Sequence, residues 1–371
     1  MYNSYKIKVP GKLFIAGEYA VLEPGNLAIV IAVNRYMETE IKAYKDNQLH
    51  LPQLGYDSVS WSWKAGELTF HPEGSKLAFI KNAISLFYTL LQENSVEIRP
   101  FALSITSELD DVSGKKYGLG SSAAVVVSVI SALFHFYQNE KIKPKKENIF
   151  KLAAMAHIKT QGNGSCADIA ASTFGGWLGF STFELNWIKK QIEEKVHIST
   201  LLREKWPGLI IKPLTPPEYF NLVVGWTSSE ASTAPMVNIV MKLKQEQPSL
   251  YDRFLKESKI AVNNLINSFL DDNGKIAIDS LKQNRMALKK LGEHAGVNIE
   301  TPQLESLIRI ANKYGAGKSS GAGGGDCGIA FITDPSLVTP LQNEWQSHGI
   351  MPLDIQVSKD GATIEPLLER K

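Results

Sequence analysis

The sequence contains few cysteines. Only Cys166 and Cys327 occur in 371 residues. Two thiols so far apart form neither a disulfide framework nor a multi-cysteine metal cluster, which excludes the small disulfide-rich secreted scaffolds and the zinc modules. A reducing cytoplasm is therefore the expected compartment.

The sequence also lacks a long uninterrupted apolar segment. The longest one runs from Ala123 to Phe134, and Ser128 and Ser131 interrupt it. It is shorter than the ~18 residues that a membrane span requires, so we expect no membrane partner. The N-terminal residues, MYNSYKIKVPGK, carry positive charge without an apolar signal core, and we do not expect secretion.

Charge of either sign is not in excess. The chain has 40 Lys+Arg and 38 Asp+Glu, a formal net charge of +2. Without a broad basic field, the protein is not expected to bind nucleic acid. Any anionic ligand must instead be bound by a local group of residues.

The chain length and a proline-rich segment near the middle of the sequence predict two domains. A chain of 371 residues with 44% hydrophobic residues is too long for one small core. The segment WPGLIIKPLTPPEYF contains four prolines and indicates a crossover, so the expected domains are 1–215 and 216–371. Alternating apolar residues predict strands at 6–9, 13–16, 28–33 and 37–44, whereas helical patterns cover 76–94, 121–137, 146–159 and much of 236–296.

One segment, GLGSSAAVVVS (residues 118–128), joins a glycine turn directly to an apolar helix pattern. The first N–H groups of such a helix are unpaired and carry the positive end of its dipole, which favours phosphate. This interpretation makes the candidate phosphate contacts Gly118, Leu119, Gly120, Ser121, Ser122 and Ala123. The alternative is a glycine turn that leads into a buried core helix with Ser121 as its N-cap.

Four segments together resemble one enzyme family. They are PGKLFIAGEYAVL (10–22), GLGSSAAVVVS (118–128), NGSCADIAASTFGG (163–176) and SSGAGGGDCGIA (319–330). Their order and spacing resemble the GHMP family of small-molecule kinases, which includes galactokinase, homoserine kinase, mevalonate kinase and phosphomevalonate kinase. The resemblance implies an α+β fold of two domains, an N-terminal ribosomal-protein-S5-like α/β domain and a C-terminal ferredoxin-like domain, with the active site between them.

The resemblance also implies catalytic roles. Asp168 would be the base or the carboxylate that orients the acceptor, and Lys12 would lie beside it and stabilise charge on the transferring oxygen. The hydroxyl of Ser122 would face the Mg²⁺ that accompanies ATP. The alternatives are a helix-capping Asp168 and a solvated Lys12 on a strand.

Within the family, three features resemble the phosphomevalonate kinase branch: GEYAVLEPGNLAIV (17–30), GWTSSEAST (225–233) and KSSGAGGGDCGIA (318–330). They imply ATP and phosphomevalonate as substrates. An acceptor with a carboxylate at one end and a phosphate at the other needs several cationic or N–H donors. The expected acceptor contacts are Glu18, Tyr19, Lys159, Lys318, Ser319, Ser320, Gly321, Ala322 and Gly323.

Several alternatives remain open from the sequence. His157 occupies the position where mevalonate kinases place a metal-binding glutamate, and we expect it to be a packing residue. The acceptor could be mevalonate or a sugar phosphate, and the fold could serve a non-catalytic metabolite sensor. Lys12 and Asp168 together favour catalysis, because a sensor has no use for them. Both a monomer and a homodimer are compatible with the sequence.

Overall fold

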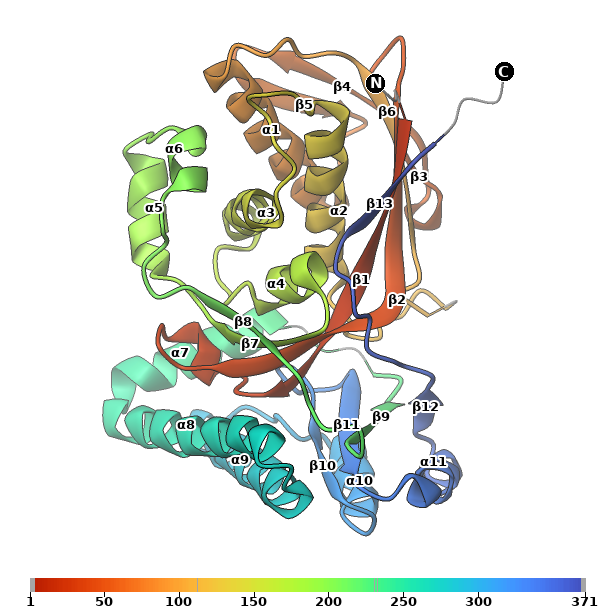
Figure 1. The fold of residues 1–371 in the computed structure, drawn as a ribbon, viewed down its shortest axis with the longest axis vertical. Helices are drawn as coiled ribbons and strands as arrows, with labels where there is room; N and C mark the ends of the chain where they lie inside the picture. Colours follow the sequence, from red (N-terminus) through yellow and green to blue (C-terminus); the bar gives the residue numbers. More distant parts are fainter. Residues whose placement is uncertain (1–3, 112, 230, 232, 368–371) are drawn as a thin grey trace.

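The computed structural model describes residues 4–111, 113–229, 231 and 233–367, and their strands form two sheets (Figure 1). The first sheet consists of β1 (Ser4–Ala16), β2 (Ala28–Ala43), β3 (Gln48–Leu51), β4 (Tyr56–Lys64), β5 (Glu67–His71), β6 (Phe101–Ser107), β7 (Trp177–Ser181), β8 (Ile210–Leu214) and β13 (Thr363–Pro366). The second consists of β9 (Asn221–Trp226), β10 (Ala316–Ser319), β11 (Cys327–Ile332) and β12 (Met351–Leu353). Mixed strands and helices give the α+β class that the sequence predicts.

The first sheet is built around two long strands. Its order is β13-β1-β2-β6-β3-β4-β5, with β7 paired to β2 and β8 paired to β7, and only the β3–β6 pair is parallel among the described strands. The sequence predicted two short strands in place of each long one. In β1 the ladder to β2 shifts register between Pro10 and Gly11 and then continues, so a bulge, not a loop, separates the predicted pieces.

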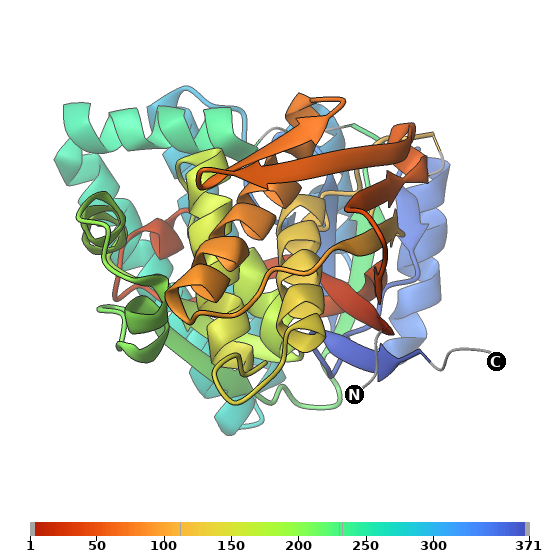
Figure 2. The ribbon, with the colours of Figure 1, turned by 90° about the horizontal axis from the view of Figure 1, so that it is seen from above.

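Helices cover one face of the first sheet. They are α1 (Ala78–Glu93), α2 (Ser121–Phe136), α3 (Lys146–Gln161), α4 (Ala167–Phe174), α5 (Leu185–Glu193) and α6 (Ile198–Arg203). Figure 2 shows α1, α2 and α3 side by side, and α2 packs directly on β1 and β2. Because α2 contacts the sheet on one side and helices on the others, it is apolar nearly all round, as a central helix should be.

The second sheet is antiparallel, in the order β10-β11-β9-β12. The helices of this half are α7 (Thr233–Glu246), α8 (Pro248–Leu270), α9 (Gly274–Ala295), α10 (Pro302–Ala311) and α11 (Val338–Ser347). The segment GWTSSEAST begins at the end of β9, and its Glu230 and Ser232 lie outside the described residues.

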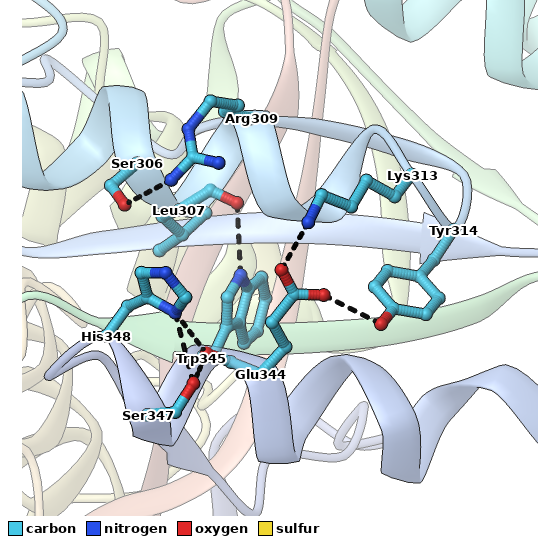
Figure 3. Close-up of polar contacts among 9 residues, drawn as sticks. All are labelled: Ser306, Leu307, Arg309, Lys313, Tyr314, Glu344, Trp345, Ser347 and His348. Carbon is cyan, nitrogen blue, oxygen red and sulfur yellow. Dashed lines mark hydrogen bonds and ion pairs between the residues drawn. The ribbon is translucent and has the colours of Figure 1, made fainter.

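Helix α11 is fixed to α10 by polar contacts around a buried tryptophan (Figure 3). Trp345 is fully buried, and its indole N–H donates to the Leu307 carbonyl at 3.0 Å. The Glu344 carboxylate accepts hydrogen bonds from Lys313 and Tyr314, which lower the pKa of Glu344. These contacts hold α10 and α11 on the face of the second sheet that carries Val223, Ala330 and Ile332.

The chain changes sheets between β8 and β9, next to the expected division at residue 215, and later crosses back. After β12, Ser358 pairs with Ala32, and β13 pairs with β1 (Figure 1). The last strand therefore completes the first sheet. Within the described part of the chain, no helix is both long enough and apolar enough to cross a membrane.

Candidate active site

A cavity of about 320 Å³ lies where the two halves of the chain meet. Residues from distant parts of the sequence line it, among them Lys12, Ser122, His157, Asp168, Thr233 and Ala322. They come from β1, α2, α3, α4, α7 and the loop after β10. The volume is typical of a site for small molecules.

The glycine turn and the start of α2 form one wall. Gly120, at φ +82°, is the N-cap, so the expectation that Ser121 caps the helix is wrong. Ser121 and Ser122 line the cavity in the first helical turn, where N–H groups have no acceptor further back in the helix. The side chains of Leu119 and Ala123 are buried beneath the turn, so only their backbone could contact a phosphate.

Lys12 is attached to the same turn. It follows the bulge of β1, where Gly11 approaches so closely that a Cβ would lie 2.8 Å from the Leu119 carbonyl oxygen. The Lys12 backbone N–H donates to that oxygen at 2.8 Å, and its ammonium donates to the Gly118 carbonyl at 3.0 Å. These bonds position the ammonium at the glycine turn before α2.

Asp168 lies in the first turn of α4, whose N-cap is Cys166. Its carboxylate accepts the Ile169 N–H at 2.9 Å and faces the cavity. One turn further along α4, the Ser172 hydroxyl donates to the Pro10 carbonyl at 2.8 Å, which fixes the helix to β1. Lys12 and Asp168 therefore face one cavity. The Lys12 ammonium itself donates to the Gly118 carbonyl.

The glycine-rich segment 319–330 is hydrogen-bonded to the segment 10–22. The Ser320 hydroxyl accepts from the Phe14 N–H at 3.0 Å and donates to the Phe14 carbonyl at 2.8 Å, so both its bonding directions are used within the protein. The Tyr19 hydroxyl donates to the Ala322 carbonyl at 2.7 Å. These loop-to-loop bonds place Ser320, Gly321 and Ala322 on the cavity wall.

A buried ion pair lies behind this contact. Lys318 and Glu18 are 1% and 2% exposed, and the Lys318 ammonium donates to one Glu18 oxygen and to the Ser319 carbonyl. The charge of Lys318 is thus neutralised inside the protein and Lys318 does not line the cavity, so the structure gives no support to the prediction that it binds the acceptor. The other oxygen of Glu18 has no hydrogen-bond partner, and Glu18 lines the cavity.

Neither cysteine offers a nucleophile. Burial raises the pKa of both thiols, and a neighbouring carboxylate adds to the effect in each case, Asp168 for Cys166 and Asp326 for Cys327. Both are free thiols in the interior. The chemistry of the cavity therefore depends on Lys12, Asp168 and the N-terminal turn of α2.

Comparison with known proteins identifies this arrangement. The family model for the GHMP kinases N terminal domain matches residues 78–176, and that for the GHMP kinases C terminal region matches residues 277–350. A phosphomevalonate kinase of Streptomyces sp. (strain CL190) is 32% identical over 366 residues, which is 95% of this chain and 96% of that protein. The chain belongs to the GHMP kinase family.

Solved structures agree with the assignment of this chain to the GHMP kinase family. The Lin0012 protein of Listeria innocua is 40% identical, with a TM-score of 0.91 over 98% of this chain and 99% of that one. Streptococcus pneumoniae phosphomevalonate kinase, in complex with phosphomevalonate and AMPPNP, is 29% identical, with a TM-score of 0.82 over 95% of this chain and 99% of that one. The two-domain GHMP kinase fold expected from the sequence is confirmed.

Besides Lys318, three other expected acceptor contacts of the GHMP kinase do not line the cavity. Lys159 is exposed at the end of α3. Ser319 is buried in β10, and Gly323 sits so close to the Ile299 carbonyl that a Cβ would lie 2.3 Å from it. These three residues are neighbours in sequence of residues that line the cavity, but the fold does not place them in the cavity wall.

Other lining residues were missed by sequence reasoning. Lys116 precedes the glycine turn by two residues, and Gln161 lies one helical turn after His157. His157 itself was expected to be a packing residue, yet it lines the cavity together with Phe79. The helical spacing of His157 and Gln161 is the one signal that could have linked them.

The Glu18–Lys318 pair gives a test of stability. Glu18→Gln leaves the Lys318 ammonium buried beside a neutral amide, and we expect the free energy of unfolding to fall by about 3–5 kcal/mol. Urea unfolding followed by fluorescence measures it. The matched control is Glu23→Gln, because Glu23 pairs with a largely exposed Lys244 and should change stability by about 1 kcal/mol at most. Equal losses in the two variants would contradict the buried-pair interpretation.

Proposed function

We propose that this GHMP kinase transfers the γ-phosphoryl group of ATP to the phosphate of phosphomevalonate, giving ADP and diphosphomevalonate. The observation that carries the proposal is that Lys12, Asp168 and the first turn of α2 face one cavity. The relatives named above as phosphomevalonate kinases, one of them solved with phosphomevalonate and AMPPNP, support the choice of acceptor. The buried free thiols support a reducing, cytoplasmic location.

The geometry suits phosphoryl transfer, which depends on positioning and on stabilising charge. Unpaired N–H groups at the start of α2 bind the phosphates of ATP. The Lys12 ammonium stabilises the negative charge that develops on the transferring group. Asp168 orients the acceptor; a base is hardly needed, because the second pKa of a phosphate monoester is about 6 and the acceptor oxygen is already ionised near neutral pH.

Magnesium fits this site as a companion of ATP. No cluster of three or more His, Cys, Asp or Glu side chains suited to a metal occurs in the described part of the chain. Mg²⁺ usually keeps several waters and binds through one or two protein oxygens plus substrate phosphates. The Ser122 hydroxyl and the Asp168 carboxylate, both on the cavity wall, are the hard oxygen donors that would hold it. When bound, Mg²⁺ neutralises charge on the nucleotide phosphates.

The acceptor is the part of the proposal to test. The purified protein is supplied with ATP and Mg²⁺, and ADP release is measured with phosphomevalonate, mevalonate, galactose and homoserine. We expect kcat/KM for phosphomevalonate to exceed that for mevalonate at least about tenfold, because mevalonate forfeits charge-assisted bonds at the lysine-lined end of the cavity. Equal or faster turnover of mevalonate would overturn the acceptor, and absence of turnover with every compound would favour a sensor.

A further inference from the structure

His157 is a buried polar side chain without a partner in the protein. It is 2% exposed on α3 and lines the cavity, and neither Nδ1 nor Nε2 has a hydrogen-bond partner. An unpaired buried polar group destabilises a fold by about 1–3 kcal/mol. Two such atoms in one ring, facing a ligand cavity, indicate that the partner is a ligand.

The surroundings of the ring determine what it can bind. Phe79 of α1 packs against it, with ring centroids 5.2 Å apart and an interplanar angle of 31°. Burial lowers the pKa of His157, and the Asp168 carboxylate opposes this only in part. The imidazole is therefore neutral near pH 7. A neutral imidazole offers one N–H donor and one lone-pair acceptor.

We propose that His157 is a specificity-determining residue that binds the hydroxyl group on the carbon chain of the acceptor, an inference that rests on the proposed function. A hydroxyl both donates and accepts, as the neutral imidazole does. A hydroxyl can pair with either ring nitrogen, and because it is uncharged it is not repelled by the nearby Asp168 carboxylate. The carboxylate and phosphate groups of the acceptor are negatively charged and would be repelled by Asp168. The phosphate end belongs with Lys12, on the wall formed by the glycine turn.

A second histidine shows what a packing role looks like in this chain. His135, on α2, is largely buried, and its Nδ1 bonds to the Ser131 carbonyl of its own helix at 2.8 Å. It does not line the cavity. His157 has no such internal partner for either ring nitrogen. The His157 side chain is therefore available to bind a ligand in the cavity, and it does not have the packing role of His135.

The proposal is tested by a double-mutant-type cycle, in which kcat/KM is compared for several enzyme variants with two substrates. The substrates are phosphomevalonate and its 3-deoxy analogue, in which hydrogen replaces the C3 hydroxyl; the enzymes are wild type, His157→Leu and His157→Gln. For wild type we expect kcat/KM to fall at least about tenfold when the hydroxyl is removed. For His157→Leu the two substrates should react equally well. His157→Gln, which keeps a donor and an acceptor, should recover part of the preference.

The controls separate the possible failures. His135→Leu should keep the wild-type preference for the hydroxylated substrate, and the melting temperature of each variant checks its fold. A His157→Leu enzyme that retains the tenfold preference would overturn the role of His157, as would a wild type that does not distinguish the two substrates. A wild type without activity on phosphomevalonate would instead overturn the proposed function, so the two failures are distinguishable.

Discussion

Lys12→Met is expected to lower kcat about a hundredfold or more, which corresponds to about 2.7 kcal/mol of lost transition-state stabilisation. The Lys12 ammonium sits at the phosphate-binding turn through its bond to the Gly118 carbonyl, so methionine removes the charge and keeps most of the side-chain volume. Steady-state measurement of ADP release at saturating substrates gives kcat. Asp168→Asn should have an effect of similar size if the charge of the carboxylate, and not only its shape, orients the acceptor.

The matched control for Lys12→Met is Lys8→Met. Lys8 lies on the same strand but is exposed, with its ammonium 4.1 Å from the centre of the Tyr36 ring, and its replacement should leave kcat unchanged. Combining Lys12→Met with Asp168→Asn should lower kcat by less than the product of the single effects, since residues that act as a unit are not additive. Strict additivity would show that the two side chains act independently.

Gly120→Val is expected to weaken ATP binding at least about a hundredfold. Gly120 has a φ of +82°, which β-branched residues strongly disfavour, and a Cβ there would lie 2.9 Å from Cγ of Lys12. The substitution therefore distorts the turn whose N–H groups bind phosphate and displaces Lys12. Loss of two charge-assisted bonds, each worth about 1.5–3 kcal/mol, accounts for an effect of this size. Calorimetric titration with the non-hydrolysed analogue AMPPNP measures it.

Gly114→Val separates backbone strain from damage to the site. Gly114 has nearly the same φ, +83°, but a Cβ there would have no atom within 4 Å. Both variants should lose comparable stability from backbone strain, whereas only Gly120→Val should lose nucleotide affinity. Normal affinity in Gly120→Val would mean that the turn before α2 does not bind the phosphates.

The sequence was most informative where local pattern and function coincide. The glycine turn followed by an apolar helix correctly predicted α2 and its place at the cavity, because turn chemistry and helix periodicity are both local signals. The short strands β8 and β13 were not predicted, since IIKPL and TIEP are largely exposed and contain proline, so neither shows a strand alternation.

The contacts in the site that could not be predicted are those between residues far apart in the sequence. Lys318 was assigned to the acceptor because it precedes a glycine-rich loop, but its partner Glu18 lies 300 residues away in the sequence, and no local pattern reports that pairing. Lys116 was not considered, and His157 was expected to be a packing residue, although both line the cavity. Each is an ordinary residue on its own segment, and only the packing of that segment brings it to the cavity.

The return of β13 to β1 has a consequence for synthesis on the ribosome. Residues 5–8 of β1 leave the exit tunnel long before residues 363–366, the strand that covers their outer edge, because Lys8 and Thr363 are 355 residues apart in the sequence. At the usual rates of about 5–20 residues per second, this edge waits for tens of seconds with its backbone N–H and C=O groups unpaired. Such an edge is a template for other strands, so the nascent chain can mispair at β1 until residues 363–366 emerge.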